Sequence, residues 1–276
     1  EGFNANKDFL QTNADYYSAY IRSLDFEDAS APDTINQWVK DATNDTIDKI
    51  VDEIGDDLVM YLINAIYFKG DWKEQFSANK TRKMEFNAPD GKVETDFMNR
   101  RGNIDYLKLN DITGVILPYE DERFAFVGLL PAEGQTPKDL INDLSALDLT
   151  MLLKNKEIKN IELSLPKFES SYEDSLKNEL SNLGMDIAFE PYNADFSLMR
   201  EDLKKDLYIG DVKQKTYIKV DEKGTEASAV TSVEPENTSM PVELPKVVFD
   251  RPFVYGIIDV ETGIPLFIGI MENPTI

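Results

Sequence analysis

A long connection between residues 221 and 245, DEKGTEASAVTSVEPENTSMPVELP, lies between two strand-like segments, Thr216 to Val220 and Val247 to Ile258. A loop of this length inside a compact domain is uncommon and is usually functional. It has no apolar stripe at the spacing of a helix. When alternate residues from Thr225 are grouped, however, one group is small or apolar and the other group carries all the charge. These groups are Thr225, Ala227, Ala229, Thr231 and Val233 against Glu226, Ser228, Val230, Ser232 and Glu234. Since one buried and one solvated side is typical of a strand in a sheet, we predict that this loop can become such a strand.

The rest of the sequence alternates helix and strand signals, which predicts an α+β fold. Apolar periodicity predicts four helices, over residues 7–20, after the helix-start signal Ser30-Ala31-Pro32-Asp33, and over 140–153 and 172–183. The dense apolar run from Leu58 to Phe68 is predicted to be a central strand covered on both faces. Shorter apolar segments predict the remaining strands, over 21–26, 84–86, 93–98, 106–109, 115–117, 124–130, 161–168, 207–220, 253–258 and 264–270.

The chain contains no histidine and no cysteine, which removes the commonest general base and the commonest soft metal ligands. A Ser-His-Asp or Cys-His arrangement is therefore excluded, and no phosphate-binding or dinucleotide-binding glycine motif occurs. The 52 acidic residues leave room for a glycosidase-like carboxylate pair, but solvated charge is the far commoner role of such residues. We expect a protein that is not an enzyme and that has no cofactor and no metal site.

The net charge of −23 restricts the partners of the protein. Such a surface repels phosphate backbones and anionic lipid, so we expect neither nucleic acid nor membrane as a partner. Solubility is the simplest role for this acidity. The sequence has no apolar run long enough to span a bilayer, and its first residues, EGFNANKDFL, do not resemble a signal peptide.

Three separated blocks of the sequence resemble the serpins, a superfamily of serine protease inhibitors. They are Ile35-Asn36-Gln37-Trp38-Val39, Leu62-Ile63-Asn64-Ala65-Ile66-Tyr67-Phe68-Lys69-Gly70-Asp71-Trp72, and Asp221-Glu222-Lys223-Gly224-Thr225-Glu226-Ala227. The ending, with Phe249, Pro252-Phe253 and Phe267-Ile268-Gly269, supports the resemblance. It implies a serpin fold with a large main sheet, further sheets, helices packed around them and an exposed reactive-centre loop.

The sequence departs from the family pattern in two respects. Elements with which serpins usually begin are not found, so we expect residues 1–276 to form a single serpin domain that lacks its N-terminal part. The missing N-terminal segment of the same fold is then an expected partner. In addition, Gln214 stands where many serpins carry a histidine, which excludes a histidine pH switch there while leaving a donor and an acceptor for Asn64.

The resemblance implies that residues 221–245 are the reactive-centre loop and that their first part is its hinge. In that mechanism a protease attacks the loop and forms an acyl-enzyme, and the severed loop inserts into the main sheet as a new strand. The implied hinge consists of Glu222, Gly224, Thr225, Glu226, Ala227, Ser228 and Ala229. Gly224 permits the change of backbone at the pivot, and a charge in place of Thr225 would face burial. Asn64, Trp72 and Gln214 are implied to control opening of the sheet, although ordinary core packing would account for the first two as well.

Family spacing counted from Glu222 places the scissile bond between Thr238 and Ser239. The bonds Asn237-Thr238 and Ser239-Met240 remain alternatives, whereas Met240-Pro241 is disfavoured because proline after the cut resists most serine proteases. A small β-branched residue such as Thr238 favours an elastase-like or subtilisin-like target. No Lys or Arg lies between Lys223 and Lys246, which argues against a trypsin-like target.

The sequence therefore leaves two predicted functions. The first is a suicide inhibitor of serine proteases, which would be secreted because its role is extracellular. The alternative is a noninhibitory serpin that acts as a binding or carrier protein.

Overall fold

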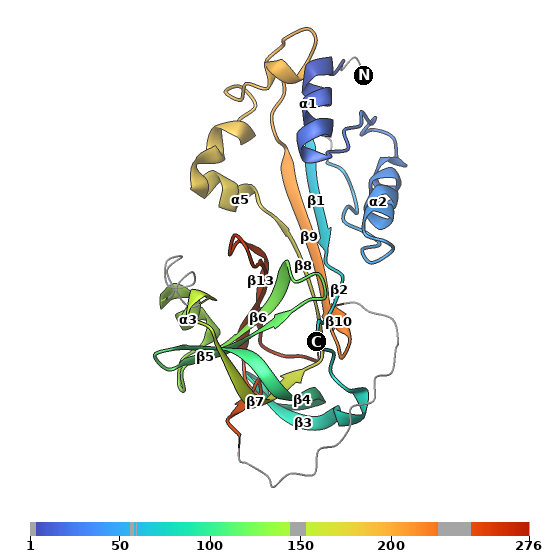
Figure 1. The fold of residues 1–276 in the computed structure, drawn as a ribbon. Helices are drawn as coiled ribbons and strands as arrows, with labels where there is room; N and C mark the ends of the chain where they lie inside the picture. The colour runs from blue at the N-terminus through green and yellow to red at the C-terminus, as the bar shows by residue number, and fades with distance from the viewer. Residues whose placement is uncertain (1–3, 56–57, 59, 144–152, 226–243, 276) are drawn as a thin grey trace. The chain divides into compact units, whose positions relative to one another are not determined.

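The computed structural model describes residues 4–55, 58, 60–143, 153–225 and 244–275. The chain divides into two compact units (Figure 1). Unit 1 consists of residues 1–67 and 171–217, and unit 2 consists of residues 68–170 and 218–276. Both units combine helices with strands, as the α+β prediction requires. Among the described residues, no helix is both long and apolar enough to cross a bilayer.

The described part of unit 1 includes two long helices and a parallel strand pair. Helix α1 spans Lys7–Tyr17, and helix α2 spans Ala31–Ala42. Strand β1, Tyr61–Tyr67, pairs in parallel with the first part of β9, Asp211–Val220. Strand β8 (Phe168–Ser175), which enters unit 1 at Ser171, also pairs with β9. The remaining elements are the short helix α5 (Lys177–Leu180), a π-helical turn (Ser181–Met185) and two 3-10 turns (Asp186–Phe189 and Ser197–Met199).

Helix α1 ends earlier than the apolar pattern predicted, at Tyr17 instead of Tyr20. Its start is capped by Asn6, whose side-chain oxygen accepts from the backbone N–H of Asp8 at 2.8 Å. At its end, Ser18 adopts a left-handed conformation with φ 49°, and Ala19 N–H donates to the carbonyl of Asn13. This is the conformation that commonly closes a helix, so the chain turns away before Tyr20.

Helix α2 packs its buried residues Ala31, Ile35 and Val39 inward along one face. Pro32 stands in its first turn, where a missing N–H costs nothing. The buried face joins a hydrophobic cluster with residues of the following segment and of β1, which include Ile47, Ile50, Val51, Tyr61, Ile63 and Ala65. Burial of this face positions β1 beside the helix.

Strand β1 is not the doubly covered central strand that the run from Leu58 to Phe68 predicted. None of its residues is fully buried, and the side chain of Leu62 is exposed. Only alternate residues reach the cluster on α2, so the apolar run reflects one packed face and one that is open. Among the described strands, β9 is the neighbour of β1, which leaves β1 at the end of its sheet.

Two further predictions for unit 1 were wrong. The segment 21–26, predicted as a strand, is irregular, because no described strand pairs with it. The helix predicted over 172–183 begins only at Lys177, since residues 172–175 continue β8 and pair with β9. Pairing within a sheet thus outweighs the helical apolar spacing at its start. Gly184, with φ 99°, interrupts the helical backbone as expected.

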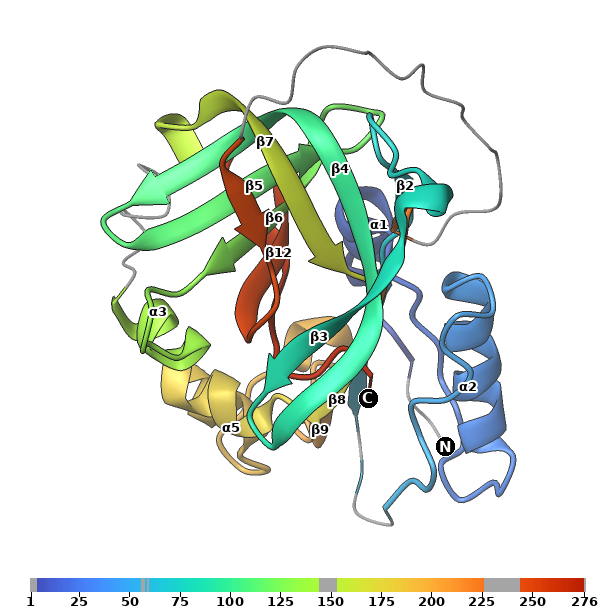
Figure 2. The ribbon, with the colours of Figure 1, turned by 90° about the horizontal axis from the view of Figure 1, so that it is seen from below.

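The described part of unit 2 is built on an eight-stranded sheet with the order β11-β7-β4-β5-β6-β12-β13, in which β3 pairs with β4. Figure 2 labels β3, β4, β5, β6, β7 and β12 of this sheet. The predicted hairpins are confirmed: β3 and β4 flank the turn at 89–90, and β12 and β13 flank the turn at Gly263. The predicted helix over 140–153 corresponds in its first part to α3, Pro137–Asp143, and residues 144–152 lie outside the described residues. The strands are β3 (Arg82–Ala88), β4 (Gly91–Leu109), β5 (Ile112–Pro118), β6 (Phe124–Leu130), β7 (Glu157–Pro166), β11 (Lys246–Val248), β12 (Phe253–Asp259) and β13 (Pro265–Met271).

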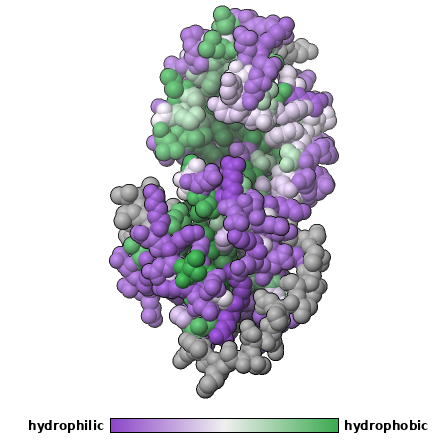
Figure 3. Space-filling model, in the orientation of Figure 1, coloured by the Kyte–Doolittle hydropathy of each residue, from purple (hydrophilic) through white to green (hydrophobic). Residues whose placement is uncertain are grey.

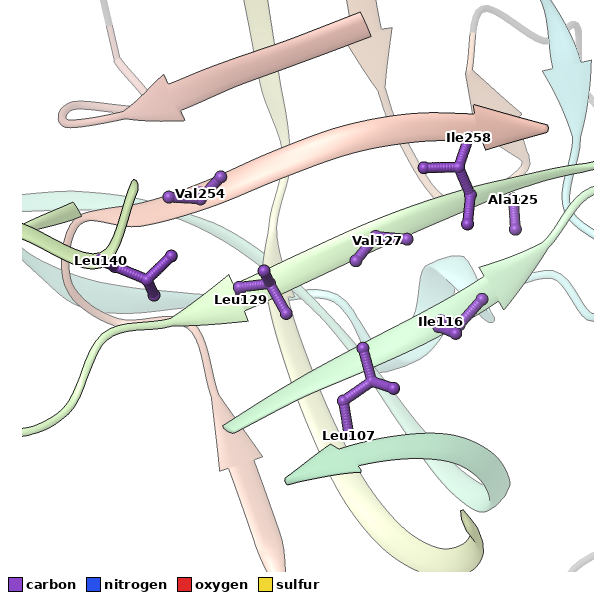
Figure 4. Close-up of a cluster of buried hydrophobic side chains, with 8 residues drawn as sticks. All are labelled: Leu107, Ile116, Ala125, Val127, Leu129, Leu140, Val254 and Ile258. Carbon is purple, nitrogen blue, oxygen red and sulfur yellow. The ribbon is translucent and has the colours of Figure 1, made fainter. Parts of the chain in front are cut away.

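A hydrophobic cluster fills one side of this sheet (Figure 4). Its side chains come from β4, β5, β6, β12 and helix α3, and each is at most 5% exposed. Alternating strand residues reach the cluster, and the residues between them in β6 and β12 are also buried or nearly so, which shows that these strands are covered on both faces. The cluster consists of Leu107, Ile116, Ala125, Val127, Leu129, Leu140, Val254 and Ile258. The cluster thus joins four strands of unit 2 to helix α3.

Candidate functional site

The long connection leaves β9 through a tight turn in unit 2. The N–H of Asp221 donates to the carbonyl of Gly224 at 3.0 Å, and the Asp221 carboxylate accepts from the N–H of Lys223 at 2.9 Å. The chain then forms a two-residue strand, β10 (Gly224–Thr225), which pairs antiparallel with β2 (Gly70–Asp71). Thr225 also pairs antiparallel with Val220, the last residue of β9. The first residues of the connection therefore already form a strand with a neighbour on each side.

Gly224 lies where no side chain fits. A Cβ atom there would overlap the carbonyl oxygen of Gly70 and would lie 2.7 Å from Cα of Asp71. Both are backbone atoms, which cannot rotate away as a side chain could. The close pairing of β10 with β2 therefore requires glycine at this position.

Residues 72–76 hold the carbonyl groups of the turn. Trp72 donates its backbone N–H to the carbonyl of Lys223 at 2.7 Å and its indole N–H to that of Asp221 at 2.8 Å. The N–H of Phe76 donates to the carbonyl of Glu222 at 2.7 Å. The side chain of Trp72 is buried. Three consecutive carbonyls are thus fixed, and the structure brings Trp72 together with the predicted hinge.

The Glu222 carboxylate is held by two partners from other parts of unit 2. Thr81 donates its hydroxyl to one carboxylate oxygen at 2.7 Å, and Lys167 Nζ lies 2.8 Å from the other. Burial acts to raise the pKa of Glu222, but the hydrogen bonds from Lys167 and Thr81 outweigh it and hold the pKa below its ordinary value. Glu222 is therefore a charged anchor for the hinge.

Thr225 is fully buried, and its hydroxyl lies 2.7 Å from the hydroxyl of Tyr119. Tyr119 follows strand β5 and is itself almost completely buried. Its ring stacks on Trp72, with centroids 4.8 Å apart and planes within 10°. Since a buried hydroxyl is costly without a partner, the two hydroxyls satisfy each other.

The predicted pair Asn64 and Gln214 lies in unit 1, on the neighbouring strands β1 and β9. The parallel register sets these two residues directly opposite each other. Both are therefore at one place in the strand pair. The predicted hinge residues Glu226, Ala227, Ser228 and Ala229, and the predicted scissile residues Thr238 and Ser239, lie outside the described residues.

Sequence reasoning missed Tyr119, Thr81 and Lys167, which contact the hinge from 55 to 141 positions away. Periodicity and turn motifs report only local structure, so they carry no signal for such contacts. Among the described residues, the surroundings of Thr225 provide strand pairing with Gly70 and Val220 and a hydrogen bond to Tyr119. Over the ranges that the structure describes, no group of three or more acidic side chains is arranged to hold a metal ion.

Comparisons with known proteins agree with this geometry. The family model described as "Serpin (serine protease inhibitor)" matches residues 1–274. An uncharacterized serpin-like protein of Thermococcus kodakarensis is 35% identical over an alignment of 277 positions, which covers 99% of this chain and 64% of that protein. An alpha-1-antitrypsin homolog of Cyprinus carpio is 34% identical over an alignment of 280 positions, which covers all of this chain and 73% of that protein. The crystal structure of a thermophilic serpin, tengpin, in the native state superposes with a TM-score of 0.90 and 39% identity, over 98% of this chain and 70% of tengpin. The chain thus spans about two thirds to three quarters of the length of these relatives.

Proposed function

The chain belongs to the serpin family, and we propose that it inhibits serine proteases by inserting its cleaved loop into the sheet that contains β9. The family is one of protease inhibitors in general. The proposal for this chain adds the inhibitory mechanism and the class of target. It is supported by the way in which β10 is paired.

The register of β10 is the observation that carries the proposal. Gly70 and Val220 both face Thr225, and these two residues are 150 positions apart. Asn64 and Gln214, which face each other across β1 and β9, are also 150 positions apart. A strand that continued from Thr225 in the same register would therefore fit between β1 and β9 without any slip. In that register, Thr231 would lie between Asn64 and Gln214.

The composition of the loop suits this insertion. Register is fixed wherever one face of a strand becomes buried, and here the face that contains Thr225 and Thr231 carries no charge. Separation of β1 from β9 breaks their parallel pairing, and the new strand replaces it with antiparallel pairing on both sides. The exchange adds a strand to the sheet, which supplies the driving force for displacing a bound protease.

The chemical step takes place on the protease. Its serine oxygen attacks the carbonyl carbon of the residue before the cut, the peptide C–N bond breaks, and the leaving nitrogen takes up a proton as an amine. The ester that remains links the protease to the loop. If insertion is completed before water reaches the ester, the protease is trapped; if not, the loop is hydrolysed as a substrate.

We propose Thr238-Ser239 as the cleaved bond and elastase-like or subtilisin-like proteases as the targets. The absence of Lys and Arg between Lys223 and Lys246 argues against trypsin-like proteases. We also propose that the protein acts outside the cell, because such targets are extracellular.

The test is incubation of the protein with pancreatic elastase, subtilisin and trypsin, followed by denaturing electrophoresis. We expect an SDS-stable complex with elastase or subtilisin and none with trypsin. Mass spectrometry of the released C-terminal peptide would identify the cut, with Ser239 expected at its new N-terminus. Cleavage without any stable complex across a broad panel of proteases would instead support the alternative, a noninhibitory binding or carrier serpin.

We further propose that a segment equivalent to the N-terminal part of the relatives completes unit 1. Strand β1 carries no charged residue and has one described strand neighbour, so its other edge offers unpaired backbone groups. The side chains of Tyr16 and Tyr17 are exposed on α1, and Figure 3 shows apolar surface among the polar residues of this unit. A matching N-terminal polypeptide, added in trans, should raise the Tm of the chain and lower its self-association; no change in either would contradict this proposal.

A further inference from the structure

The buried pair formed by Tyr119 and Thr225 is the feature from which we draw a further inference. Both side chains are at most 1% exposed, and their hydroxyl oxygens lie 2.7 Å apart. Thr225 is the last described residue before the loop, and Tyr119 comes from the connection between β5 and β6. The pair therefore joins the start of the loop to the firmly packed sheet of unit 2.

The ring of Tyr119 and its hydroxyl have separate roles. The ring is held by aromatic neighbours: it stacks on Trp72 and lies 4.8 Å, centroid to centroid, from the ring of Phe68 at a tilt of 54°. A phenylalanine would keep these contacts. The hydroxyl reaches Thr225, so its removal would affect the hinge while leaving the packing of the ring in place.

This hydrogen bond differs in kind from the ion pair at Glu222. Burial raises the pKa of Tyr119 well above its ordinary value, so the phenol stays neutral at physiological pH. A hydrogen bond between two neutral, buried groups is not screened by salt, unlike the partly exposed ion pair between Lys167 and Glu222. The hinge thus has one anchor that depends on ionic conditions and one that does not.

We propose that Tyr119 is a positioning residue that keeps Thr225 seated in the sheet before the loop is cut. The hinge then exists in two states, seated and released, and the Tyr119–Thr225 hydrogen bond favours the seated state. With Thr225 seated, the first step of loop insertion has been taken in advance, and Glu226 is the next residue to enter. The equilibrium between the seated and released hinge does not depend on the proposed function, whereas its effect on protease inhibition rests on that function.

A double-mutant cycle tests the hinge equilibrium without any protease. Tyr119→Phe leaves the Thr225 hydroxyl buried without its partner, and Thr225→Val does the same to the Tyr119 hydroxyl. An orphaned buried hydroxyl is costly, whereas replacement of both partners by apolar groups of similar shape is close to neutral. We therefore expect each single variant to release the hinge and the double variant to seat it again.

The readout is hydrogen exchange at the backbone amides of Trp72 and Phe76, which donate to the carbonyls of Lys223 and Glu222. Each single variant should exchange at least about fivefold faster at these amides, and the double variant should return to within about twofold of the parent. Equal exchange in all four proteins, or effects of the two substitutions that simply add, would overturn the proposal. A return of the exchange rates in the double variant to those of the parent also shows that the single variants are not merely misfolded.

Tyr255→Phe is the matched control. Tyr255 is another buried tyrosine of unit 2, and its hydroxyl bonds to Ser170 and not to the hinge. We expect no change in exchange at Trp72 and Phe76 in this variant, and an increase equal to that in Tyr119→Phe would show a general loosening instead of a hinge effect.

The inhibition arm uses the same variants with the protease that forms a stable complex. Release of the hinge delays insertion relative to hydrolysis, so Tyr119→Phe should raise the number of inhibitor molecules consumed per protease about twofold or more, and the double variant should restore the parent value. If the parent forms no stable complex but the exchange cycle is non-additive, the proposed function fails and the hinge equilibrium stands. If stable complexes form but the effects of the two substitutions on exchange simply add, the proposed function stands and the hinge equilibrium fails.

Discussion

Lys167 Nζ lies 2.8 Å from a carboxylate oxygen of Glu222, and this contact ties the hinge to the connection between β7 and β8. Glu222 is the more buried partner, with 14% of its side chain exposed against 37% for Lys167. Thr81 occupies the second carboxylate oxygen, so the anchor is a small network and not a lone surface pair.

Reversal of the charge at position 222 should release the hinge. Glu222→Lys would place an ammonium group beside that of Lys167 and would remove the acceptor for Thr81. We expect a loss of roughly 1–2 kcal/mol in the free energy of unfolding, because the site is partly solvated. Glu222→Gln, which keeps an acceptor, should cost clearly less. Chemical denaturation of both variants measures this difference, and equal losses would contradict the role of charge.

The same anchor should weaken in acid. The pKa of Glu222 in the folded protein lies below its ordinary value of 4.5, so folding favours the charged form. Its contribution to stability is therefore complete above that ordinary value and is lost as the pH falls through the lower folded value. Hydrogen exchange at Phe76, corrected for intrinsic rates, should accelerate over this range in the parent. The Glu222→Gln variant has no carboxylate to titrate, and a parallel acceleration there would argue against the assignment.

Gly224→Ala tests the close approach of β10 to β2. The added methyl group would collide with the backbone at Gly70 and Asp71, which we expect to cost about 1–3 kcal/mol and to unpair β10. Gly102→Ala is the control, because a Cβ atom there meets nothing within 4 Å. Thermal unfolding and exchange at Trp72 compare the two variants. A Gly224→Ala protein with the parent Tm and exchange would show that the strand pair can move apart freely.

Adjacent positions in the loop allow the insertion register to be tested directly. Thr231 belongs to the uncharged face and would lie between Asn64 and Gln214, whereas Ser232 belongs to the opposite face. Thr231→Lys should therefore convert the inhibitor into a substrate once the proposed N-terminal segment covers the open face of β1 on which Asn64 lies, because the charge would then have to be buried, at a cost of several kcal/mol. Ser232→Lys should retain most of the SDS-stable complex formed with elastase or subtilisin. If both variants inhibit equally, the loop does not insert in this register.

The sequence predicted those parts of the fold that depend on local signals. The turn Ala88-Pro89-Asp90-Gly91 predicted the β3–β4 hairpin, and Gly263 predicted the turn between β12 and β13. The predicted start of a helix at residue 172 was wrong because that segment depends on a distant strand. Pairing with β9 holds residues 172–175 in β8, and an apolar pattern does not report the position of a neighbouring strand.

The hinge shows the same limit at the level of single residues. The resemblance assigned the residues around Gly224 to a hinge, and the structure shows that the indole N–H of Trp72 donates to the carbonyl of Asp221 in this segment. Tyr119 and Lys167 were not predicted, because their role follows from contacts made only when distant segments pack together. Thr225 was singled out for its small, uncharged side chain, and its hydrogen bond to a buried phenol is information that only the packed structure contains.

The absence of space for a Cβ atom at Gly224 has a consequence at the level of the gene. Every missense change in a glycine codon introduces a residue with a Cβ atom, so no substitution at this codon preserves the pairing of β10 with β2. In a saturation library selected for the paired hinge, codon 224 should accept only synonymous changes, whereas codon 102, where the backbone is open, should tolerate many replacements.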